Sequence, residues 1–321
     1  MTLDSAIPTE WQWNELEMDA AFYRGLILVM AFGRNGEPVP VGTGFIVKSD
    51  GGKATAMTAA HVLAEVRRMQ TGNPRHSRTA LEMFLPSPKE VDIDRMKLQA
   101  FIWNGQGGAE GFPVTGIAFD EGSDMAILTL ARAAENAPAI PRYEFAPGDG
   151  APNIGTMLGV LSFGDLGVQD YENNGDERKF SLQIRPVLRV GRVTEIFPAG
   201  NRLCKGPCIE TSIPVYSGMS GGPVFVWDEA GKIKPIALVC SDPDPDGEQK
   251  QDTSQAGASI MALLPTETVA FPGGRQYTKF DFTFYHFAGD LRPAVVQRSY
   301  RPAGRQYLSE FASFWSLKIR F

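Results

Sequence analysis

A serine set among three glycines is the stretch that most constrains the fold of this chain. The run reads Gly218-Met219-Ser220-Gly221-Gly222-Pro223. Glycine has no Cβ and reaches backbone conformations that other residues avoid, so the run predicts a tight turn. The turn leads into an apolar stretch, Val224 to Trp227, typical of a buried strand. Such a turn either presents Ser220 for chemistry or is a glycine-rich hairpin turn.

If Ser220 is a nucleophile, other residues of the chain must activate it. A serine hydroxyl is a weak nucleophile, so it needs a base that takes its proton and donors that hold the negative oxygen formed on the substrate. The candidate donors are the backbone amides of Gly218 and Ser220, because Gly218 can turn its N–H toward the same point as that of Ser220. Gly221 and Gly222 are expected to keep side chains away from the substrate.

Of the three histidines in the chain, His61 has the most suitable setting for the base. It follows Ala54 to Ala60, a short strand-like run that ends in small residues, so its ring can stand free at a strand end. His76 lies in a polar loop and His286 in an aromatic run. The alternative reading of His61 is a structural histidine.

The imidazole of a base also needs a carboxylate that fixes its orientation, and Asp124 is the candidate. It opens a nearly continuous apolar run, Met125 to Leu130. Such a run predicts a buried strand, and an acid at its start needs a partner. The alternative reading of Asp124 is a turn or capping residue.

These three motifs resemble, in the same order, the signatures of chymotrypsin-like serine proteases. The matching stretches are Thr58-Ala59-Ala60-His61, Ser123-Asp124-Met125-Ala126-Ile127-Leu128 and the serine turn at 218–223. The resemblance implies an all-β fold of two six-stranded antiparallel β-barrels. The 34 glycines and 23 prolines suit such a turn-rich fold.

The resemblance also implies roles for the candidate residues. His61 would be the general base and then the general acid, Asp124 would orient it, and Ser220 would be the nucleophile. The Gly218 and Ser220 amides would form the oxyanion hole. We therefore expect a serine endopeptidase that acts on protein or peptide substrates through an acyl-enzyme and needs no cofactor or metal. The alternative is a protease-like module that binds a peptide or partner protein without cleaving it.

Two further stretches are similar to bacterial heat-shock proteases of the Deg, or high-temperature-requirement, type. They are Gly42 to Val47 before the histidine and Cys208 to Ile213 before the serine. This resemblance covers about residues 25 to 265. The tail beyond it is too short for the PDZ module that many Deg proteases carry, so we expect none there.

The same resemblance points to substrate-binding residues. Val239, Cys240 and Ser241 would form the strand whose backbone pairs with the substrate. Pro214, followed by Val215, would lie at the base of the specificity pocket. No carboxylate stands there, so we expect an apolar substrate side chain, which gains roughly 1.5 to 3 kcal/mol by leaving water. Asp242 or Asp244 reaching in from another wall would instead favour a basic side chain.

Length and turn composition divide the chain into four parts. Residues 1–24 form an N-terminal extension, 25–145 the first barrel, 146–265 the second barrel and 266–321 a C-terminal extension. The Pro- and Gly-rich run at 146–152 has the composition of a linker. We also expect a short amphipathic helix within residues 13–23 and a polar loop over residues 164–179.

Charge and cysteine content indicate the compartment. A net charge of -6 gives no hint of nucleic-acid binding. The first 24 residues are acid-rich, unlike a secretory signal, and the apolar run at 25–32 is too short to span a membrane. Three cysteines agree with a reducing compartment, so we expect a cytoplasmic protein. Cys204 and Cys208 are expected to be half-buried thiols rather than a disulfide or metal site.

Two remaining segments are less informative. The acidic stretch 242–247 superficially matches the start of a calcium loop but has Thr253 at the position of the bidentate carboxylate, so we expect a solvated loop. Residues 275–321 carry eight basic residues against three acidic ones and many aromatics. We expect them to cover the outside of the barrels, with an activating or docking partner or an anionic membrane face as alternatives.

Overall fold

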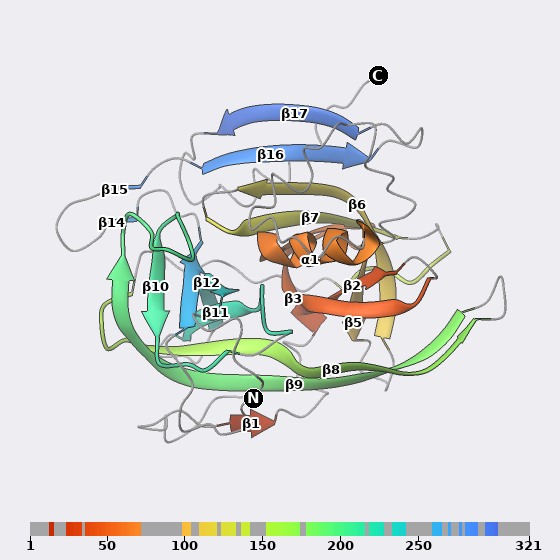
Figure 1. Ribbon diagram of the computed structural model, residues 1–321, viewed down its shortest axis with the longest axis horizontal. Helices are drawn as coiled ribbons and strands as arrows, with labels where there is room; N and C mark the ends of the chain where they lie inside the picture. The colour runs from red at the N-terminus through yellow and green to blue at the C-terminus, as the bar shows by residue number, and fades with distance from the viewer. Residues whose placement is uncertain are drawn as a thin grey trace.

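The computed structural model describes most of the two expected barrels and parts of both ends. The described residues are 13–15, 24–33, 36–71, 98–103, 109–120, 123–132, 136–141, 152–173, 178–215, 218–227, 233–241, 259–264, 269–270, 276–277, 280–287 and 293–300. Within these ranges the chain is built of antiparallel strands with a single α-helix (Figure 1). Two of its sheets close into barrels, so the expected chymotrypsin-like all-β fold is confirmed.

The first barrel contains six strands. They are β2 (Leu26–Phe32), β3 (Pro38–Ser49), β4 (Lys53–Ala59), β5 (Gln99–Trp103), β6 (Ala109–Asp120) and β7 (Met125–Ala131). Their order around the barrel is β6-β5-β2-β3-β4-β7, and pairing of β7 with β6 closes it. The helix α1 (Ala60–Thr71) follows β4 without a break. This junction places His61 at the start of the helix.

The second barrel is closed in the same way. Its strands are β8 (Met157–Asn173), β9 (Arg178–Phe197), β10 (Cys208–Thr211), β11 (Pro223–Trp227), β12 (Ile233–Ser241) and β13 (Ser259–Leu263). They follow the order β9-β10-β13-β12-β11-β8, and β8 pairs with β9. The serine turn lies immediately before β11.

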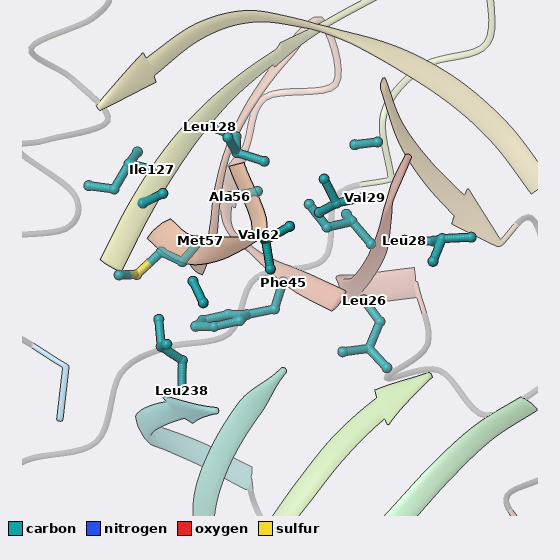
Figure 2. Packing of buried hydrophobic residues seen from close by; sticks show 14 of the residues in the cluster. Leu26, Leu28, Val29, Phe45, Ala56, Met57, Val62, Ile127, Leu128 and Leu238 are labelled. Atoms are coloured by element: carbon teal, nitrogen blue, oxygen red, sulfur yellow. The ribbon is translucent and has the colours of Figure 1, made fainter. Parts of the chain in front are cut away.

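The two barrels share a packed interface. Phe45 on β3 is fully buried and belongs to a cluster that also contains Leu238 of β12. Figure 2 shows Leu238 reaching from the second barrel toward Phe45 and Met57 of the first. Burying one such side chain stabilises the fold by roughly 1.5 to 3 kcal/mol, so the apolar interface fixes the two barrels against each other. Residues from both can then contribute to one site.

The prediction of a polar loop over residues 164–179 is wrong for most of this segment. β8 continues to Asn173 and β9 begins at Arg178, so the two strands form a long ribbon below the barrels (Figure 1). Register shifts between Gly164 and Gly167 and between Gln169 and Glu172 interrupt the pairing. Such bulges bend a strand pair.

The ribbon is held by its few apolar side chains. Leu166, Phe180 and Leu182 pack against the apolar cluster that spans both barrels. The ring of Phe180 meets those of Phe32 and Phe101 edge to face, with centroids 6.4 and 5.8 Å apart. The polar composition of the segment concealed these long-range contacts.

Both ends of the chain add strands to the barrel sheets. β1 (Trp13–Glu15) pairs with Val187 to Arg189 of β9, so the helix expected over 13–23 is wrong at its first three residues. The rest of that segment lies outside the described residues. β16 (Phe280–Phe287) pairs with β6, and β17 (Pro293–Tyr300) pairs with β16. The short strands β14 (Val269–Ala270) and β15 (Gln276–Tyr277) pair with each other.

The ribbon packing can be tested by Phe180→Ala. The substitution removes two edge-to-face contacts, each worth about 0.5 to 1.5 kcal/mol beyond area burial, so the free energy of unfolding should fall by about 1 to 3 kcal/mol. Chemical denaturation measures the change. Glu172→Ala, at an exposed position of the same ribbon, is the control and should stay within about 0.5 kcal/mol of wild type. An equal, small effect of both substitutions would contradict the packing role.

Candidate active site

Asp124 binds the start of α1 as well as the ring of His61. Its backbone carbonyl accepts a hydrogen bond from the Ala60 amide at 2.9 Å, and its Oδ1 accepts one from the His61 amide at 2.9 Å. A carboxylate that accepts a backbone N–H at a helix start acts as a cap. Asp124 is therefore both a capping residue of α1 and the partner of the His61 ring, because its two carboxylate oxygens accept from different donors.

The backbone of Asp124 has an uncommon conformation. Its φ is 54°, which makes it the non-glycine residue with positive φ in the described part of the chain. This left-handed region costs a residue with a Cβ roughly 1 to 2 kcal/mol, and aspartate tolerates it better than most. The hydrogen bonds to Ala60 and His61 hold Asp124 in place there. The conformation aims its carboxylate back at the helix.

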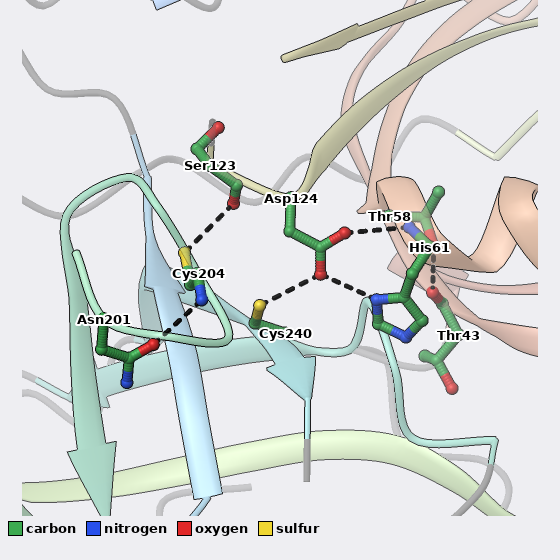
Figure 3. A network of polar contacts seen from close by, with 8 residues as sticks. All are labelled: Thr43, Thr58, His61, Ser123, Asp124, Asn201, Cys204 and Cys240. Carbon is green, nitrogen blue, oxygen red and sulfur yellow. Dashed lines mark hydrogen bonds and ion pairs between the residues drawn. The ribbon is translucent and has the colours of Figure 1, made fainter. Parts of the chain in front are cut away.

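The second carboxylate oxygen of Asp124 meets two side chains (Figure 3). Oδ2 lies 2.7 Å from Nδ1 of His61 and 3.0 Å from Sγ of Cys240. An ionised carboxylate only accepts hydrogen bonds, so Nδ1 of His61 carries a proton. In the neutral ring the other nitrogen, Nε2, is then the one able to accept a proton. The ring is one-third exposed, so Nε2 can be reached from solvent.

The thiol of Cys240 is the donor in its contact with Asp124. A hydrogen bond with Cys204, complete burial and the negative charge of Asp124 all raise the pKa of Cys240. The thiol therefore keeps its proton and donates S–H to Oδ2. Only the backbone of Cys240 was expected to take part, and a small residue within an apolar strand gives no sequence signal for this side-chain role.

Opposing effects set the pKa of His61. Burial lowers it, but the charge of Asp124 and the hydrogen bond that His61 donates to that carboxylate raise it, and the net direction is upward from 6.5. A positively charged ring is thus stabilised by Asp124. This is the property required of a base that must hold a proton for a moment and then release it.

The serine turn has the glycine conformations that its sequence predicts. Gly218 and Gly221 have φ values of 90° and 82°. A Cβ on Gly221 would lie 2.3 Å from both Thr43 O and Thr58 Oγ1, which are first-barrel atoms. Gly221 is therefore required for close approach of the two barrels. We expected this glycine to keep a side chain away from the substrate, but the atoms that a Cβ would meet belong to the first barrel.

Thr43, on β3 of the first barrel, holds the serine turn from the other side. Its amide donates to Ser220 O at 2.9 Å and its hydroxyl donates to Gly218 O at 2.7 Å. The same hydroxyl accepts from Phe163 N at 3.1 Å. The sequence gives no signal for this role of Thr43, although the residue lies within the Gly42 to Val47 motif. Thr43 fixes the Gly218–Met219 and Ser220–Gly221 peptide groups, which flank the Met219–Ser220 peptide.

The turn is also tied to β12 of its own barrel. The Gly221 amide donates to Val239 O at 2.8 Å, and the Val239 amide donates to Gly222 O at 2.9 Å. The backbone of Val239 is thus engaged by the serine turn, so the expectation that it pairs with substrate is wrong for Val239. Ser241 ends β12 and its side chain is outside the described residues.

The amides of Gly218 and Ser220 donate to no backbone oxygen among the described residues. Ser220 is partly exposed. Thr43 holds the Gly218 and Ser220 carbonyls, so the Met219–Ser220 peptide, which carries the Ser220 N–H, lies between two held peptide groups. The serine turn and the Asp124–His61 pair are both tied to the interface between the barrels, the turn through Thr43 and the pair through Cys240.

Several other predicted residues can also be located. Pro214 and Val215 are buried after β10, and the carbonyl of Pro214 accepts a hydrogen bond from Arg189. Cys204 and Cys208 are free, buried thiols, not half-buried ones. The positions outside the described residues are His76, Asp242, Asp244, Thr253 and the side chain of His286. Within the described ranges, no group of three or more His, Cys, Asp or Glu side chains is placed to hold a metal ion.

The closed antiparallel barrels define a chymotrypsin-like all-β fold. The family model for the trypsin-like peptidase domain matches residues 42–233, more than half of the chain. The chain therefore belongs to the trypsin-like peptidase domain family. No curated protein sequence matches it.

Three solved structures with a similar chain path are distant in sequence. Deg5 is 16% identical, with a TM-score of 0.41 over 71% of this chain and 88% of its own. Human heparin binding protein is 11% identical, with a TM-score of 0.43 over 78% and 90%. The structure of GrC is 15% identical, with a TM-score of 0.43 over 78% and 92%.

The pKa of His61 offers a test of its pairing with Asp124. Asp124→Asn removes the charge that raises it, so an NMR titration should show a lower pKa in the variant than in wild type. Because the folded-state pKa is raised, the pair contributes stability that is complete below about pH 6.5 and is lost as pH rises through the folded value. Denaturation between pH 5 and 9 should show this loss in wild type and not in the variant.

Asp50→Asn serves as the control, since Asp50 is exposed and bonds only the turn at Gly52 and Lys53 among the described contacts. It should leave the titration of His61 unchanged. A wild-type pKa for His61 at or below 6.5 would contradict the pairing.

The role of Thr43 is testable by an isosteric pair of variants. Thr43→Val keeps the shape but leaves the Gly218 carbonyl and the Phe163 amide without this partner, which should cost about 1 to 3 kcal/mol of stability. The reactivity of Ser220 toward a fluorophosphonate should fall at least about tenfold, the change in rate that about 1.4 kcal/mol produces. Thr43→Ser retains the hydroxyl and should keep most of the reactivity. Equal reactivity of the valine and serine variants would show that the hydroxyl does not position the turn.

Proposed function

We propose that this protein is a serine endopeptidase that hydrolyses peptide bonds with His61, Asp124 and Ser220 as its catalytic triad. The observation that carries the proposal is the pair of hydrogen bonds from Thr43 to Gly218 and Ser220. They hold the serine turn of the second barrel against the barrel that carries the Asp124–His61 pair. A merely structural glycine turn gives no reason for such a pair to stand beside it.

In the proposed reaction, Ser220 Oγ forms a bond to the substrate carbonyl carbon while its proton moves to Nε2 of His61. The carbonyl π electrons move to the oxygen, which becomes negative. As this intermediate collapses, the C–N bond breaks and His61 gives the proton to the departing amine, leaving an acyl-enzyme. Water then attacks the ester with His61 again as base, and the acid and free Ser220 are released. Positioned proton transfer of this kind contributes about 10² to 10⁴ in rate.

The negative oxygen is assigned to the amides of Gly218 and Ser220. Removing one such donor in comparable enzymes costs about 10² to 10³ in rate, because the donors are already oriented when charge develops. Thr43 supports the Ser220 donor by holding the peptide groups on either side of the Met219–Ser220 peptide. Cys240 supports the same mechanism by donating to Asp124 beside His61.

The alternative function is a module that binds a peptide or partner protein without cleaving it. The hydrogen-bonded Asp124–His61 pair favours turnover, because a histidine whose pKa is raised by a fixed carboxylate is typical of a catalytic base. The two functions differ in one measurable property, the reactivity of Ser220.

Within the family, we assign the chain to the Deg-like branch. Two motifs support this assignment, Gly42 to Val47 and Cys208 to Ile213. The cytoplasmic location and a docking or activating partner for the C-terminal extension likewise remain proposals. In the described part of the chain, the one helix is too short to cross a bilayer.

The endopeptidase proposal is tested by Ser220→Ala. The variant should fold normally but show no measurable hydrolysis of an unfolded protein substrate and no fluorophosphonate labelling. His61→Ala should behave alike, and the double variant should be scarcely slower than either single one, since triad members act as a unit. Ser212→Ala changes an exposed serine of the preceding segment and should retain full turnover. Turnover by Ser220→Ala at the wild-type rate would refute the proposal, and peptide binding without labelling of wild type would favour the alternative.

A further inference from the structure

The peptide group that carries the Gly218 N–H is not one of the two that Thr43 holds. Thr43 binds the Gly218 and Ser220 carbonyls, so its hydrogen bonds support the Ser220 amide between them. The Gly218 amide belongs to the peptide on the other side of the Gly218 Cα. Rotation about the two backbone bonds of that Cα sets its direction, and glycine permits more of these rotations than other residues. A second contact must restrict Gly218 if its amide is to keep one direction.

Leu166 of β8 supplies a contact of this kind, because its side chain lies against the Cα of Gly218. A Cβ built on Gly218, whose φ is 90°, would lie 2.6 Å from Leu166 Cδ1 and 3.0 Å from Leu166 Cγ. The backbone oxygen of Phe163, on the same strand, would lie 3.4 Å away. The side of the turn that faces β8 is therefore filled, and Gly218 cannot shift in that direction without displacing Leu166.

A bulge in β8 gives Leu166 its place beside the serine turn. Gly164 pairs with Arg185 and Gly167 pairs with Gln183, so two residues of β8, one of them Leu166, stand opposite one residue of β9. Bulges of this kind are common next to active sites, where they redirect a side chain. Leu166 also packs against the apolar cluster that spans both barrels. The cluster therefore limits movement of the leucine away from the turn.

The same strand reaches Gly218 by a second route, through Phe163. The Phe163 amide donates to Thr43 Oγ1 at 3.1 Å, and that hydroxyl donates to Gly218 O at 2.7 Å. The carbonyl of Gly218 is thus tied to β8 by hydrogen bonds, while the side chain of Leu166 contacts its Cα. One short segment of β8, residues 163–166, restricts Gly218 in both ways.

We propose that Leu166 is a positioning residue of the active site. Its contact with Gly218 keeps the Gly218 amide directed at the carbonyl oxygen that becomes negative during peptide hydrolysis. The assignment rests on the proposed peptidase function and adds a residue that acts through Gly218. Leu166 lies within the segment predicted as a polar loop, where a single leucine gives no sequence signal for such a role.

The test uses a pair of substrates that reports on the hydrogen-bond donors directly. An ester and its thionoester differ only in carrying oxygen or sulfur on the attacked carbon atom, and sulfur is the weaker hydrogen-bond acceptor. Donors aimed at this atom accelerate hydrolysis of the oxygen substrate more, so wild type should show a higher kcat/KM for the ester than for the thionoester. A loss of folded protein lowers both rates and leaves their ratio unchanged.

Leu166→Ala should lower kcat for the ester at least about tenfold, because complete loss of one donor costs about 10² to 10³ in rate. KM should change by less than about twofold, and the ester to thionoester ratio should fall at least about threefold. Leu166→Met fills nearly the same space and should restore most of kcat and of the ratio.

Val168→Ala is the matched control. Val168 is a partly exposed residue of the same strand, and none of the three atoms closest to a Cβ on Gly218 belongs to it. This variant should keep the wild-type kcat and the wild-type ester to thionoester ratio.

Three results would overturn the assignment. A raised KM with unchanged kcat in Leu166→Ala would place Leu166 against the substrate instead of Gly218. An unchanged ratio, with kcat falling only as far as the folded fraction measured by circular dichroism, would leave Leu166 a packing role alone. Equal effects of Leu166→Ala and Val168→Ala would show that the contact with Gly218 has no special part. If Leu166→Ala fails to fold, Leu166→Val, which lacks the Cδ1 atom, decides by the same ratio.

Fluorophosphonate labelling of wild type, together with turnover of the ester, distinguishes the two ways to fail. A labelled and active protein whose ester to thionoester ratio is insensitive to Leu166→Ala overturns the positioning role and leaves the peptidase function standing. A protein that is neither labelled nor active overturns the peptidase function, and the positioning role with it.

Discussion

The hydrogen bonds of Thr43 are the interaction on which the rest of the site depends. The threonine belongs to the first barrel, yet it binds the carbonyls of Gly218 and Ser220 in the second. Thr58 Oγ1 in turn donates to Thr43 O at 2.7 Å, so the threonine is itself held by its neighbouring strand. An apolar interface alone would let the barrels slide by fractions of an ångström, because hydrophobic contact is not directional. The directional hydrogen bonds of Thr43 prevent this relative movement of the barrels at the serine turn, where the position of the nucleophile must be fixed.

Asp124 fixes the position of His61 within the first barrel. One carboxylate oxygen fixes the start of α1 and the other fixes the ring of His61. The backbone and the ring of His61 are therefore both hydrogen-bonded to the same carboxylate. The cost is a positive φ at Asp124, a kind of local strain that proteins retain where the surrounding contacts enforce it. Cys240 adds a contact from the second barrel to the same carboxylate, so the interface between barrels orients the base as well as the nucleophile.

Among the described buried residues, a charged side chain, Arg189, lies in the second barrel. A cation costs much free energy to bury, and such groups are retained where they bond other polar groups or serve function. Arg189 bonds the Pro214 carbonyl just ahead of the serine turn. The same side chain can thus stiffen the segment before the nucleophile.

The sequence by itself determined the features that depend on neighbouring residues. The glycine spacing around Ser220 demanded positive φ values, and Gly218 and Gly221 have them. The apolar run after Asp124 demanded a buried strand, which is β7. The motifs around His61, Asp124 and Ser220 also implied the barrel fold, because each combines a strand with a turn in the order of the family.

Only the tertiary structure decided which groups meet across the barrels. Thr43, the thiol of Cys240 and Arg189 act on residues far away in the chain, and their own neighbours in sequence give no sign of it. The ribbon of β8 and β9 was missed for the same reason, since a polar segment became two strands through contacts of Phe180 with the first barrel. Hydrogen bonds and ring contacts of this kind depend on how the two barrels pack, a long-range property that local patterns of glycine and apolar residues do not encode.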